Sequence, residues 1–383
     1  MSMEVKRIIP IGLPSMGIDE WEACREPIES GWITQGPKVK EFETNFAKRH
    51  QVKHAFAVSN CTTALHLALL ACGVGEGDEV LVPAFTWVST ANAVKYCNAT
   101  PIFVDIDIKT FNIDINKIGE KITAKTKAII PVHLFGLCAD IEAIRQKYPN
   151  LKVIEDGACA AGSALNGRPA GGLGDIGCFS FHPRKSVTTG EGGMLTTNDD
   201  VLAVTLDRLR NHGASISEEQ RHHGPKPYIL SAFEIVGYNY RMTDIQGAIG
   251  VVQLNKLDLF IDERETWAGY YAEQLKDIPW LITPIVPKGY KHGWQSYVTY
   301  VDESIAPMKR NEIMEYLQQK GISTRPGTHA VHMLDVYSNM YNIKPNDYPG
   351  AFNADQYSMS IPLHNKMVKE DFEYIVEALK SII

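Results

Sequence analysis

The sequence predicts an α/β protein in which a mostly parallel, seven-stranded sheet lies between helices and is followed by a smaller α+β unit. Two observations favour this fold class. Short β-rich runs alternate with helical stretches through the first two-thirds of the chain. Some runs, such as KAIIPVHLF at 127–135, are almost continuously apolar, as in strands that are buried on both faces.

The elements of the larger unit follow from this alternation. We expect its strands at 54–59, 79–84, 101–105, 127–133, 152–156, 176–181 and 193–197. We expect helices between them at 62–72, 88–97, 139–148 and 200–211. A further helix begins near Thr243, because Thr243 and Gln246 fit the capping-box pattern and apolar residues then recur at helical spacing.

The pattern changes after about residue 255. A helix at 262–276, a strand at 295–301, a helix at 309–320, a strand at 356–361 and a helix at 369–381 are expected there. We therefore predict a large domain over 1–255, with the N-terminal arm, and a small C-terminal domain over 256–383. The stretch 212–233 has no clear periodicity and is predicted to be a loop, a lid or a contact segment.

Composition excludes several classes of protein. The 383 residues are 44% hydrophobic and 22% charged with a net charge of −7, which favours neither nucleic acid nor an anionic membrane as a partner. No apolar run approaches the ~20 residues of a membrane span, and the N-terminus lacks the features of a signal peptide, so we expect a cytoplasmic protein. Seven scattered cysteines without a C-x-x-C pair argue against a disulfide framework and a zinc ribbon, and no metal is expected.

Candidate chemistry lies in three segments, each expected at the carboxyl end of a strand, where open α/β sheets bind ligands. In the first, 59–63 (SNCTT), small polar residues begin a helix and leave backbone N–H groups that attract an anion. One interpretation is a phosphate site. The other is a simple N-cap by Ser59 or Asn60.

The second segment places Asp156 at the end of an apolar strand. A carboxylate there is partly desolvated unless it has a cationic partner. A protonated heteroaromatic nitrogen would be such a partner, and holding that proton would make the ring an electron sink. The alternative is a strand-end carboxylate bound to backbone amides or to an arginine.

In the third segment, a strand delivers Ser180 and His182 to its end, Pro183 stops it, and Lys185 follows in the turn. An isolated lysine is usually a solvated surface charge. A lysine beside other cations and a cofactor can instead lose its proton near neutral pH and form an imine. Glycines at 190, 192 and 193 would let backbone pack closely around it. The order of phosphate site, acid and lysine is typical of a pyridoxal-phosphate enzyme.

The chain resembles the DegT/DnrJ/EryC1/StrS family of nucleotide-sugar aminotransferases, which have the aspartate-aminotransferase-like fold type I. The most specific motifs are SFHPRK with TTGEGG (180–193) and YNYRMTDIQ (238–246). Further matching segments lie at 31–43, 57–94, 101–107, 155–163 and 361–364, so the resemblance runs nearly end to end.

This resemblance implies a role for each matching residue. Lys185 would form the internal aldimine with pyridoxal 5'-phosphate (PLP) and move the proton, and Asp156 would pair with the pyridinium nitrogen. The phosphate would be held by Asn60, Cys61, Thr62 and Ser180. Trp87 would stack on the ring, although an aromatic in PAFTW could otherwise be core packing. Asn239 would reach the phosphate from the other subunit, which implies a homodimer with active sites at the interface.

One residue departs from the family pattern. The family often has glutamine where this chain has Cys159, beside the phenolic oxygen of the cofactor. A thiol is a weaker hydrogen-bond donor than an amide, so the contact at that oxygen is in doubt. Cys159 could also be buried filler.

The resemblance implies a transaminase that takes the amino group from L-glutamate, passes through pyridoxamine phosphate, and delivers it to a nucleotide-linked keto-sugar. A family dehydratase is one alternative, but those relatives carry histidine in place of the Schiff-base lysine, whereas Lys185 is intact. A non-catalytic regulatory protein of the same fold is the other. That class usually lacks the lysine or the acid, and this chain has both.

Candidate substrate contacts are His182, the 212–233 loop and the segment 324–332. Arg325 could pair bidentately with a diphosphate, and His329 or His332 could face sugar hydroxyls. Exposed loop residues or internally satisfied histidines are the alternatives. The sequence does not identify the sugar, the nucleotide or the keto carbon.

Overall fold

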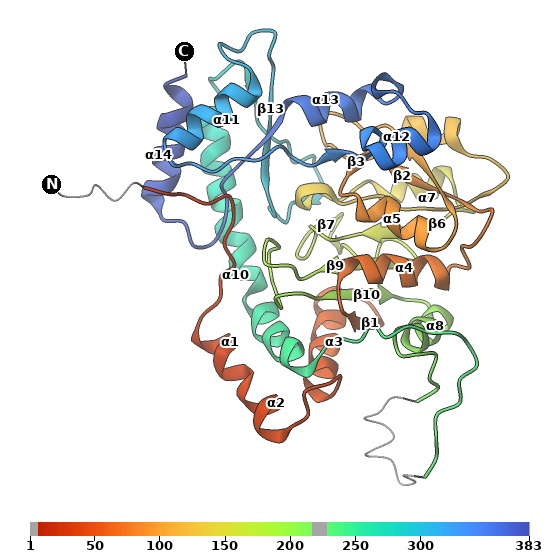
Figure 1. Ribbon diagram of the computed structural model, residues 1–383. Helices are drawn as coiled ribbons and strands as arrows, with labels where there is room; N and C mark the ends of the chain where they lie inside the picture. Colours follow the sequence, from red (N-terminus) through yellow and green to blue (C-terminus); the bar gives the residue numbers. More distant parts are fainter. Residues whose placement is uncertain (1–6, 217–227, 383) are drawn as a thin grey trace.

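The computed structural model describes residues 7–216 and 228–382 and has the predicted seven-stranded sheet (Figure 1). Its strands are β1 (His54–Val58), β2 (Glu79–Pro83), β4 (Thr100–Val104), β5 (Thr126–Ile129), β6 (Lys152–Asp156), β9 (Ile176–Ser180) and β10 (Gly193–Thr197). They lie in the order β1-β10-β9-β6-β5-β2-β4. Only β10 runs antiparallel to its neighbours in this sheet, so the predicted fold class is confirmed.

Helices cover both faces of this sheet and form a separate core with each. On one face are α4 (Cys61–Ala71), α5 (Ser89–Tyr96) and α8 (Asp200–Arg210). On the other are α3 (Pro37–Arg49), α7 (Ile141–Lys147) and the first half of α10 (Asp244–Leu275). In β2, Val80 and Val82 face the first core and Leu81 faces the second, as the alternation of a strand requires.

Helix α10 is continuous over 32 residues, whereas we expected one helix near Thr243 and another at 262–276. The expected capping box is present, since Gln246 N donates to Thr243 Oγ1 and Thr243 N donates to Gln246 Oε1. No glycine or proline interrupts 255–262. What changes there is the packing partner, from the core of the large sheet to the core of the C-terminal elements. The predicted boundary at residue 255 therefore lies inside this helix, and the division into 1–255 and 256–383 remains a prediction.

The C-terminal elements form a smaller α+β layer, which packs beside the C-terminal half of α10 (Figure 1). Its sheet, β11-β13-β15, is antiparallel and comprises Leu281–Ile282, Tyr297–Val301 and Ser358–Ile361. Helices α11 (Arg310–Gln319) and α14 (Lys369–Lys380) enclose its core. These match the predicted strands at 295–301 and 356–361 and the helices at 309–320 and 369–381.

Several short elements were not predicted. They are α1 (Ile18–Ala23), α2 (Arg25–Ser30), β3 (Phe85–Thr86), α6 (Ile115–Ile118), β7 (Ala164–Leu165), β8 (Arg168–Pro169), β11, β12 (Tyr290–Lys291), β14 (His329–Ala330), α12 (Asp335–Tyr341) and α13 (Pro349–Tyr357). The longer helix α3 was not predicted either. The pairing of β3 with β14 matters for the site, because it joins the two parts of the chain beside Trp87.

Within the described ranges, no helix is both long and apolar enough to cross a membrane. Residues 217–227, which hold His222 and His223 of the predicted 212–233 loop, lie outside the described part. The flanking residues 212–216 and 228–233 contain no helix, in agreement with that prediction. All seven cysteines are free thiols.

Candidate active site

The three predicted segments meet at one edge of the large sheet. Strands β1 and β9 are parallel to each other, because each is antiparallel to β10. Strand β6 is parallel to β9. The carboxyl ends of β1, β6 and β9 therefore lie along one edge, and Asn60, Asp156 and Ser180 stand at or just after those ends.

Asn60 caps helix α4, and the cap leaves an anion site open. Its side-chain Oδ1 accepts a hydrogen bond from Thr63 N at 2.9 Å, so the N-cap interpretation is confirmed. The first residues of a helix have no intrahelical acceptor for their N–H groups. Within the described part of the chain, no hydrogen bond is donated by the backbone N–H of Cys61 or Thr62. Capping and phosphate binding are thus compatible here.

Gly193 allows this turn to pack against the start of β10. A Cβ at Gly193 would lie 2.5 Å from the carbonyl carbon of Asn60 and 2.8 Å from Cys61 N. Any side chain there would displace the peptide that opens the proposed phosphate site. Of the three glycines that we expected to pack around the lysine and its bound ring, Gly193 instead packs against the Asn60 turn, while Gly192 meets Thr189, Met242 and Phe181.

Asp156 is a buried carboxylate whose two oxygens are each held by the protein. Thr90 Oγ1 donates to Oδ2 at 2.8 Å, and Ala158 N donates to Oδ1 at 3.2 Å. Burial raises the pKa of Asp156, and these two hydrogen bonds only partly offset that effect. The described residues provide no cationic side chain within ion-pairing distance of it. The environment is one that a protonated ring nitrogen would complete.

Lys185 lies in the turn after β9, and its Nζ is 3.2 Å from Cys159 Sγ. Burial disfavours its ammonium form, but the adjacent Cys159 and the charge of Asp156 outweigh burial, so the pKa of Lys185 lies above its ordinary value. We expected an unprotonated amine. In the cofactor-free chain the positive charge is instead favoured, because the nearest groups carry or accept negative charge.

These residues fit the chemical groups of PLP. The amine of Lys185 can react with an aldehyde, and the carboxylate of Asp156 can accept a hydrogen bond from a ring N–H. The free N–H groups of Cys61 and Thr62, with the Ser180 hydroxyl, can bind a phosphate. Asp156 ends β6 and Lys185 follows β9, its parallel neighbour, so the two groups lie at the same edge of the sheet, and the charge of each shifts the pKa of the other.

Trp87 lies next to this region and is 56% exposed. It follows β3, and its ring centroid is 5.4 Å from that of His329 in β14. The alternative of core packing is therefore wrong for Trp87. An exposed indole beside the site remains free to stack on a planar ligand.

The predicted substrate residues differ in their exposure to solvent. His182 is half-buried, and its Nδ1 accepts from Arg184 N at 3.2 Å, while burial lowers its pKa. Arg325 and His329 are exposed. His332 has no exposed surface, contacts Pro345 O through Nε2 at 3.1 Å, and packs on Tyr348. We therefore do not carry His332 into the proposed substrate site.

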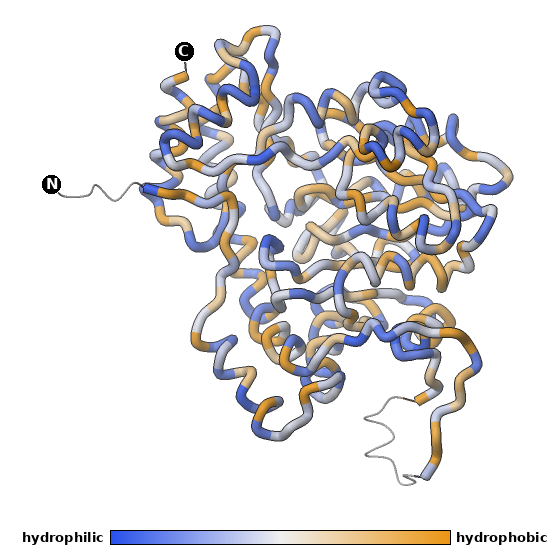
Figure 2. Tube along the Cα trace, viewed as in Figure 1, coloured by the Kyte–Doolittle hydropathy of each residue, from blue (hydrophilic) through white to orange (hydrophobic). Residues whose placement is uncertain are grey.

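Asn239 is exposed on a segment that runs beside the Asn60 turn of the same chain. Its neighbour Tyr240 accepts a hydrogen bond from Ser59 N at 2.8 Å, and Arg241 pairs with Val58 in a β-bridge. The segment before it, 228–236, carries exposed Tyr228, Leu230, Phe233 and Val236. Figure 2 shows this arm as a largely hydrophobic strip leading away from the sheet.

Sequence reasoning missed two residues of the site. Thr90 and Thr86 form a hydroxyl pair, with their Oγ1 atoms 3.1 Å apart, next to Asp156. The i,i+4 spacing of two threonines across a strand end and a helix start was a usable signal.

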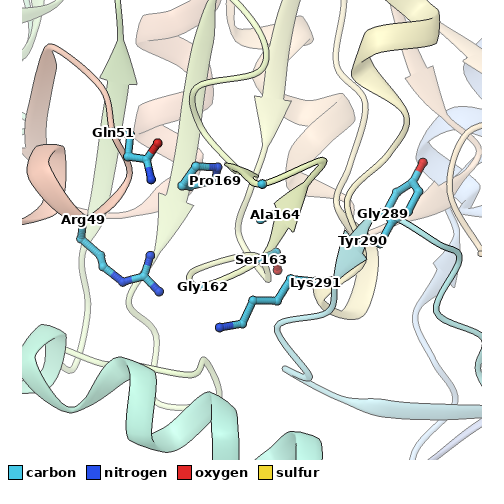
Figure 3. Close-up of a pocket in the computed structure, with 10 residues that line it drawn as sticks. Arg49, Gln51, Gly162, Ser163, Ala164, Pro169, Gly289, Tyr290 and Lys291 are labelled. Carbon is cyan, nitrogen blue, oxygen red and sulfur yellow. The ribbon is translucent and has the colours of Figure 1, made fainter.

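A cavity of the described chain lies away from these residues. It has a volume of about 310 Å³, and Figure 3 shows the Arg49 and Lys291 side chains extending toward the same space. None of its lining residues belongs to the predicted site. No cluster of three or more metal-ligating side chains occurs among the residues that the structure describes.

Comparison with known proteins gives a consistent match. Residues 14–380 match the model of the DegT/DnrJ/EryC1/StrS aminotransferase family. The chain is 39% identical over 386 residues to the spore coat polysaccharide biosynthesis protein SpsC of Bacillus subtilis, covering 100% of this chain and 99% of that protein. It is 38% identical over 379 residues to the GDP-perosamine synthase of Caulobacter vibrioides, covering 98% of each.

The fold also matches solved structures along nearly its whole length. A Streptococcus pneumoniae protein assigned as a sugar aminotransferase superposes with a TM-score of 0.89 at 28% identity, over 98% of both chains. That protein has been solved in PMP and PLP forms.

Proposed function

The chain belongs to the DegT/DnrJ/EryC1/StrS aminotransferase family, a family of PLP-dependent sugar aminotransferases, and from that premise we propose its reaction. It transfers an amino group from L-glutamate to a nucleotide-linked keto-sugar and releases 2-oxoglutarate. The donor follows from the resemblance to the family. The sugar nucleotide follows from it too, and is supported by relatives named GDP-perosamine synthase and spore coat polysaccharide biosynthesis protein.

The observation that carries the proposal is one half-buried amine and one buried carboxylate beside an open helix N-terminus. Lys185 and Asp156 interact electrostatically at the carboxyl ends of neighbouring strands. The unpaired N–H groups of Cys61 and Thr62 begin helix α4 at the same edge. An amine, an acid and a phosphate site in this arrangement match the three polar ends of PLP.

When bound, PLP supplies an electron sink that stabilises a carbanion at the substrate carbon. The protein supplies the rest. Lys185 would hold the cofactor and carry a proton at Nζ, Asp156 would keep the ring nitrogen protonated, and Ser180 would donate its hydroxyl to the phosphate. Trp87 would shield one face of the ring from water, and Cys159 would contact the phenolic oxygen.

Three exposed or half-buried side chains remain candidates for contacting the sugar nucleotide. His329 lies against Trp87 at the surface, so it would meet the sugar next to the ring. Arg325 is exposed and could bind the diphosphate with two parallel hydrogen bonds. His182 lies between Ser180 and Lys185 in the chain and is half-buried.

The site would be completed by a second copy of the chain. Asn239 is exposed, and the hydrophobic arm 228–236 precedes it. Scattered exposed apolar residues need no explanation, but a contiguous strip indicates an interface. We therefore propose a homodimer in which Asn239 contributes to the phosphate site of the other subunit.

The first experiment tests the lysine. Purified protein incubated with PLP and reduced with borohydride is expected to carry the cofactor covalently on the peptide that contains Lys185, as read by mass spectrometry. The Lys185→Ala variant should lose both this adduct and turnover. The surface variant Lys291→Ala should keep both. Wild-type transamination by Lys185→Ala would contradict the assignment.

The second experiment tests the substrates. Keto-sugar nucleotides that differ in the base and in the keto carbon are each incubated with enzyme and L-glutamate, and 2-oxoglutarate release is followed. We expect one acceptor to support many turnovers. If the enzyme carries the Lys185 adduct but no sugar nucleotide supports release of 2-oxoglutarate, the proposed acceptor or donor is wrong, while the PLP assignment stands.

A further inference from the structure

The carboxylate of Asp156 is fixed in orientation by groups on two different elements. Ala158 N, in the loop after β6, donates to Oδ1. Thr90, in the first turn of α5, donates to Oδ2 at 2.8 Å. With one oxygen held from each side, the carboxylate plane cannot rotate without losing a hydrogen bond in a buried environment, where such a loss is costly.

The direction of the Thr90 hydrogen bond is itself determined. An ionised carboxylate can only accept, so the single hydroxyl proton of Thr90 points to Asp156. The Thr86 hydroxyl lies 3.1 Å from that of Thr90. Because the Thr90 proton is already used, Thr86 donates and Thr90 accepts. The pair forms a short chain of hydroxyls that ends on the carboxylate.

Thr86 is in turn fixed by the pairing of β3 with β14. Thr86 is the register partner of His329, and Phe85 is the partner of Ala330. Side chains alternate along β3, so Thr86 is buried toward Thr90, while the next residue, Trp87, is exposed against His329. The backbone that presents Trp87 to the surface therefore also positions the hydroxyl chain.

We propose that Thr90 is a positioning residue that acts through Asp156, and that Thr86 orients its hydroxyl. This inference rests on the proposed function, in which Asp156 pairs with the ring nitrogen of PLP. Each carboxylate oxygen keeps a free lone pair after its protein hydrogen bond, so the carboxylate remains able to bind a ring N–H. Thr90 holds it ionised and in a single orientation for that contact.

The test compares variants of the full-length enzyme reconstituted with PLP. Thr90→Val removes the hydroxyl with little change in volume. It is expected to weaken PLP binding roughly tenfold to a hundredfold, the range of a hydrogen bond to a charged group. The rate at which L-glutamate converts the bound cofactor should fall by a factor in the same range. Thr90→Ser restores the hydroxyl and should recover both to within about threefold. Thr86→Val should show a smaller loss of the same kind.

Two further readouts separate positioning from a structural effect. The absorbance spectrum of the bound cofactor reports ring protonation and should change in Thr90→Val but not in Thr90→Ser. The melting temperature of the cofactor-free Thr90→Val chain should stay close to that of the wild type, so that a loss of folding stability does not explain the loss of PLP affinity. If Thr90→Val fails to fold, Thr90→Ala takes its place, since it also lacks the hydroxyl.

Asp156→Asn makes the outcomes distinguishable. If Asp156→Asn weakens PLP binding and turnover while Thr90→Val and Thr90→Ala match the wild type, the positioning role is overturned and the proposed function stands. If Asp156→Asn itself keeps wild-type affinity and turnover, the role proposed for Asp156 fails. A loss in Thr90→Val that serine does not rescue also overturns the inference.

Discussion

The amine of Lys185 lies 3.2 Å from the sulfur of Cys159. The resemblance noted from the sequence leads us to expect glutamine at this position, so a thiol here is a departure from the expected pattern. Sulfur at hydrogen-bond distance favours the ammonium form of the lysine and raises its pKa against the effect of burial. The residue at position 159 therefore influences the charge state of the proposed reactive amine.

We expect Cys159→Ala to accelerate the attachment of PLP to the cofactor-free chain near neutral pH. The substitution removes a contribution that raises the pKa of Lys185 and leaves burial, which lowers it, so more of the amine is neutral. Only the neutral amine attacks an aldehyde. The rate of attachment, followed by absorbance in a stopped-flow instrument, should show its pH midpoint at a lower pH than in the wild type.

Cys97→Ala is the matched control, because Cys97 is buried at the end of α5 and does not contact Lys185. Its pH midpoint should equal that of the wild type. A Cys159→Ala midpoint that is unchanged, or that lies at higher pH, would show that the sulfur does not govern the charge of Lys185.

A second prediction concerns the subunit interface. Lys185→Ala and Asn239→Asp homodimers should each be inactive or strongly impaired. When the two are unfolded together and refolded, half of the dimers are mixed, and each mixed dimer has one site with both native residues. The mixture should recover up to about a quarter of wild-type activity if the dimer is symmetric.

Recovery requires that Asn239 act across the interface. If Asn239 served the site of its own chain, mixed dimers would still hold one defect in each site, and activity would stay near the level of the separate variants. Sedimentation measurements on the same samples show whether dimers formed.

Much of the fold followed from the sequence because its strands are buried on both faces and its turns carry strong signals. Strand β10 has the predicted bounds, and the capping box at Thr243 fixed the start of α10. The expectation of two separate helices within α10 was wrong. In the sequence alone, a change of packing partner along one helix resembles a change from one element to the next. Short pairings such as β3 with β14 depend on residues over 240 positions apart, and no local pattern reports them.

The residues of the candidate site also divide into those that local sequence patterns indicate and those that only packing brings together. Lys185, Asp156 and Asn60 stand next to strand ends, where local pattern and chemistry coincide. Thr90 acts only through a side chain 66 residues away, and its role emerges only when the two are packed together. His332 was predicted to contact substrate because it is a polar residue in an expected loop. The prediction was wrong because packing buries His332 against Tyr348.

The buried ion pair of Arg210 with Glu43 provides a test of stability. Both side chains are 4% exposed, and Glu43 also accepts from Ala57 N, while Arg210 donates to Ala57 O. Among the described residues, Glu43→Ala leaves the buried guanidinium with the exposed Asp207 as its one remaining carboxylate partner, besides the carbonyl of Ala57. We expect a loss of about 3 kcal/mol in the free energy of unfolding, measured with urea.

The control is the exposed pair of Arg25 with Glu29, in which Glu29→Ala should change the free energy of unfolding by less than about 1 kcal/mol. A double variant, Glu43→Leu with Arg210→Met, should be more stable than Glu43→Ala alone, because it leaves no buried charge. Equal losses for Glu43→Ala and Glu29→Ala would contradict the assigned importance of the buried pair.

The last prediction concerns the stability of the folded chain at acid pH. His50 is buried, stacks on Phe46 with ring centroids 4.1 Å apart, and contacts Ala170 O through Nδ1 at 2.9 Å. Burial lowers the pKa of His50 to about 4 in the folded chain, whereas an unfolded histidine titrates near 6.5. Between these values the unfolded state binds more protons, so the free energy of unfolding falls as the pH falls, by about 1.4 kcal/mol per pH unit.

This contribution is complete above pH ~6.5 and is lost by pH ~4. His50→Phe cannot be protonated and retains an aromatic ring for stacking, so its free energy of unfolding should fall less steeply than that of the wild type over this range. Its stability at pH ~7 should nonetheless be lower, because the hydrogen bond to Ala170 O is lost. His329→Gln, at an exposed position, should keep the wild-type slope. Parallel pH curves for the wild type and His50→Phe would mean that His50 is not held neutral by burial.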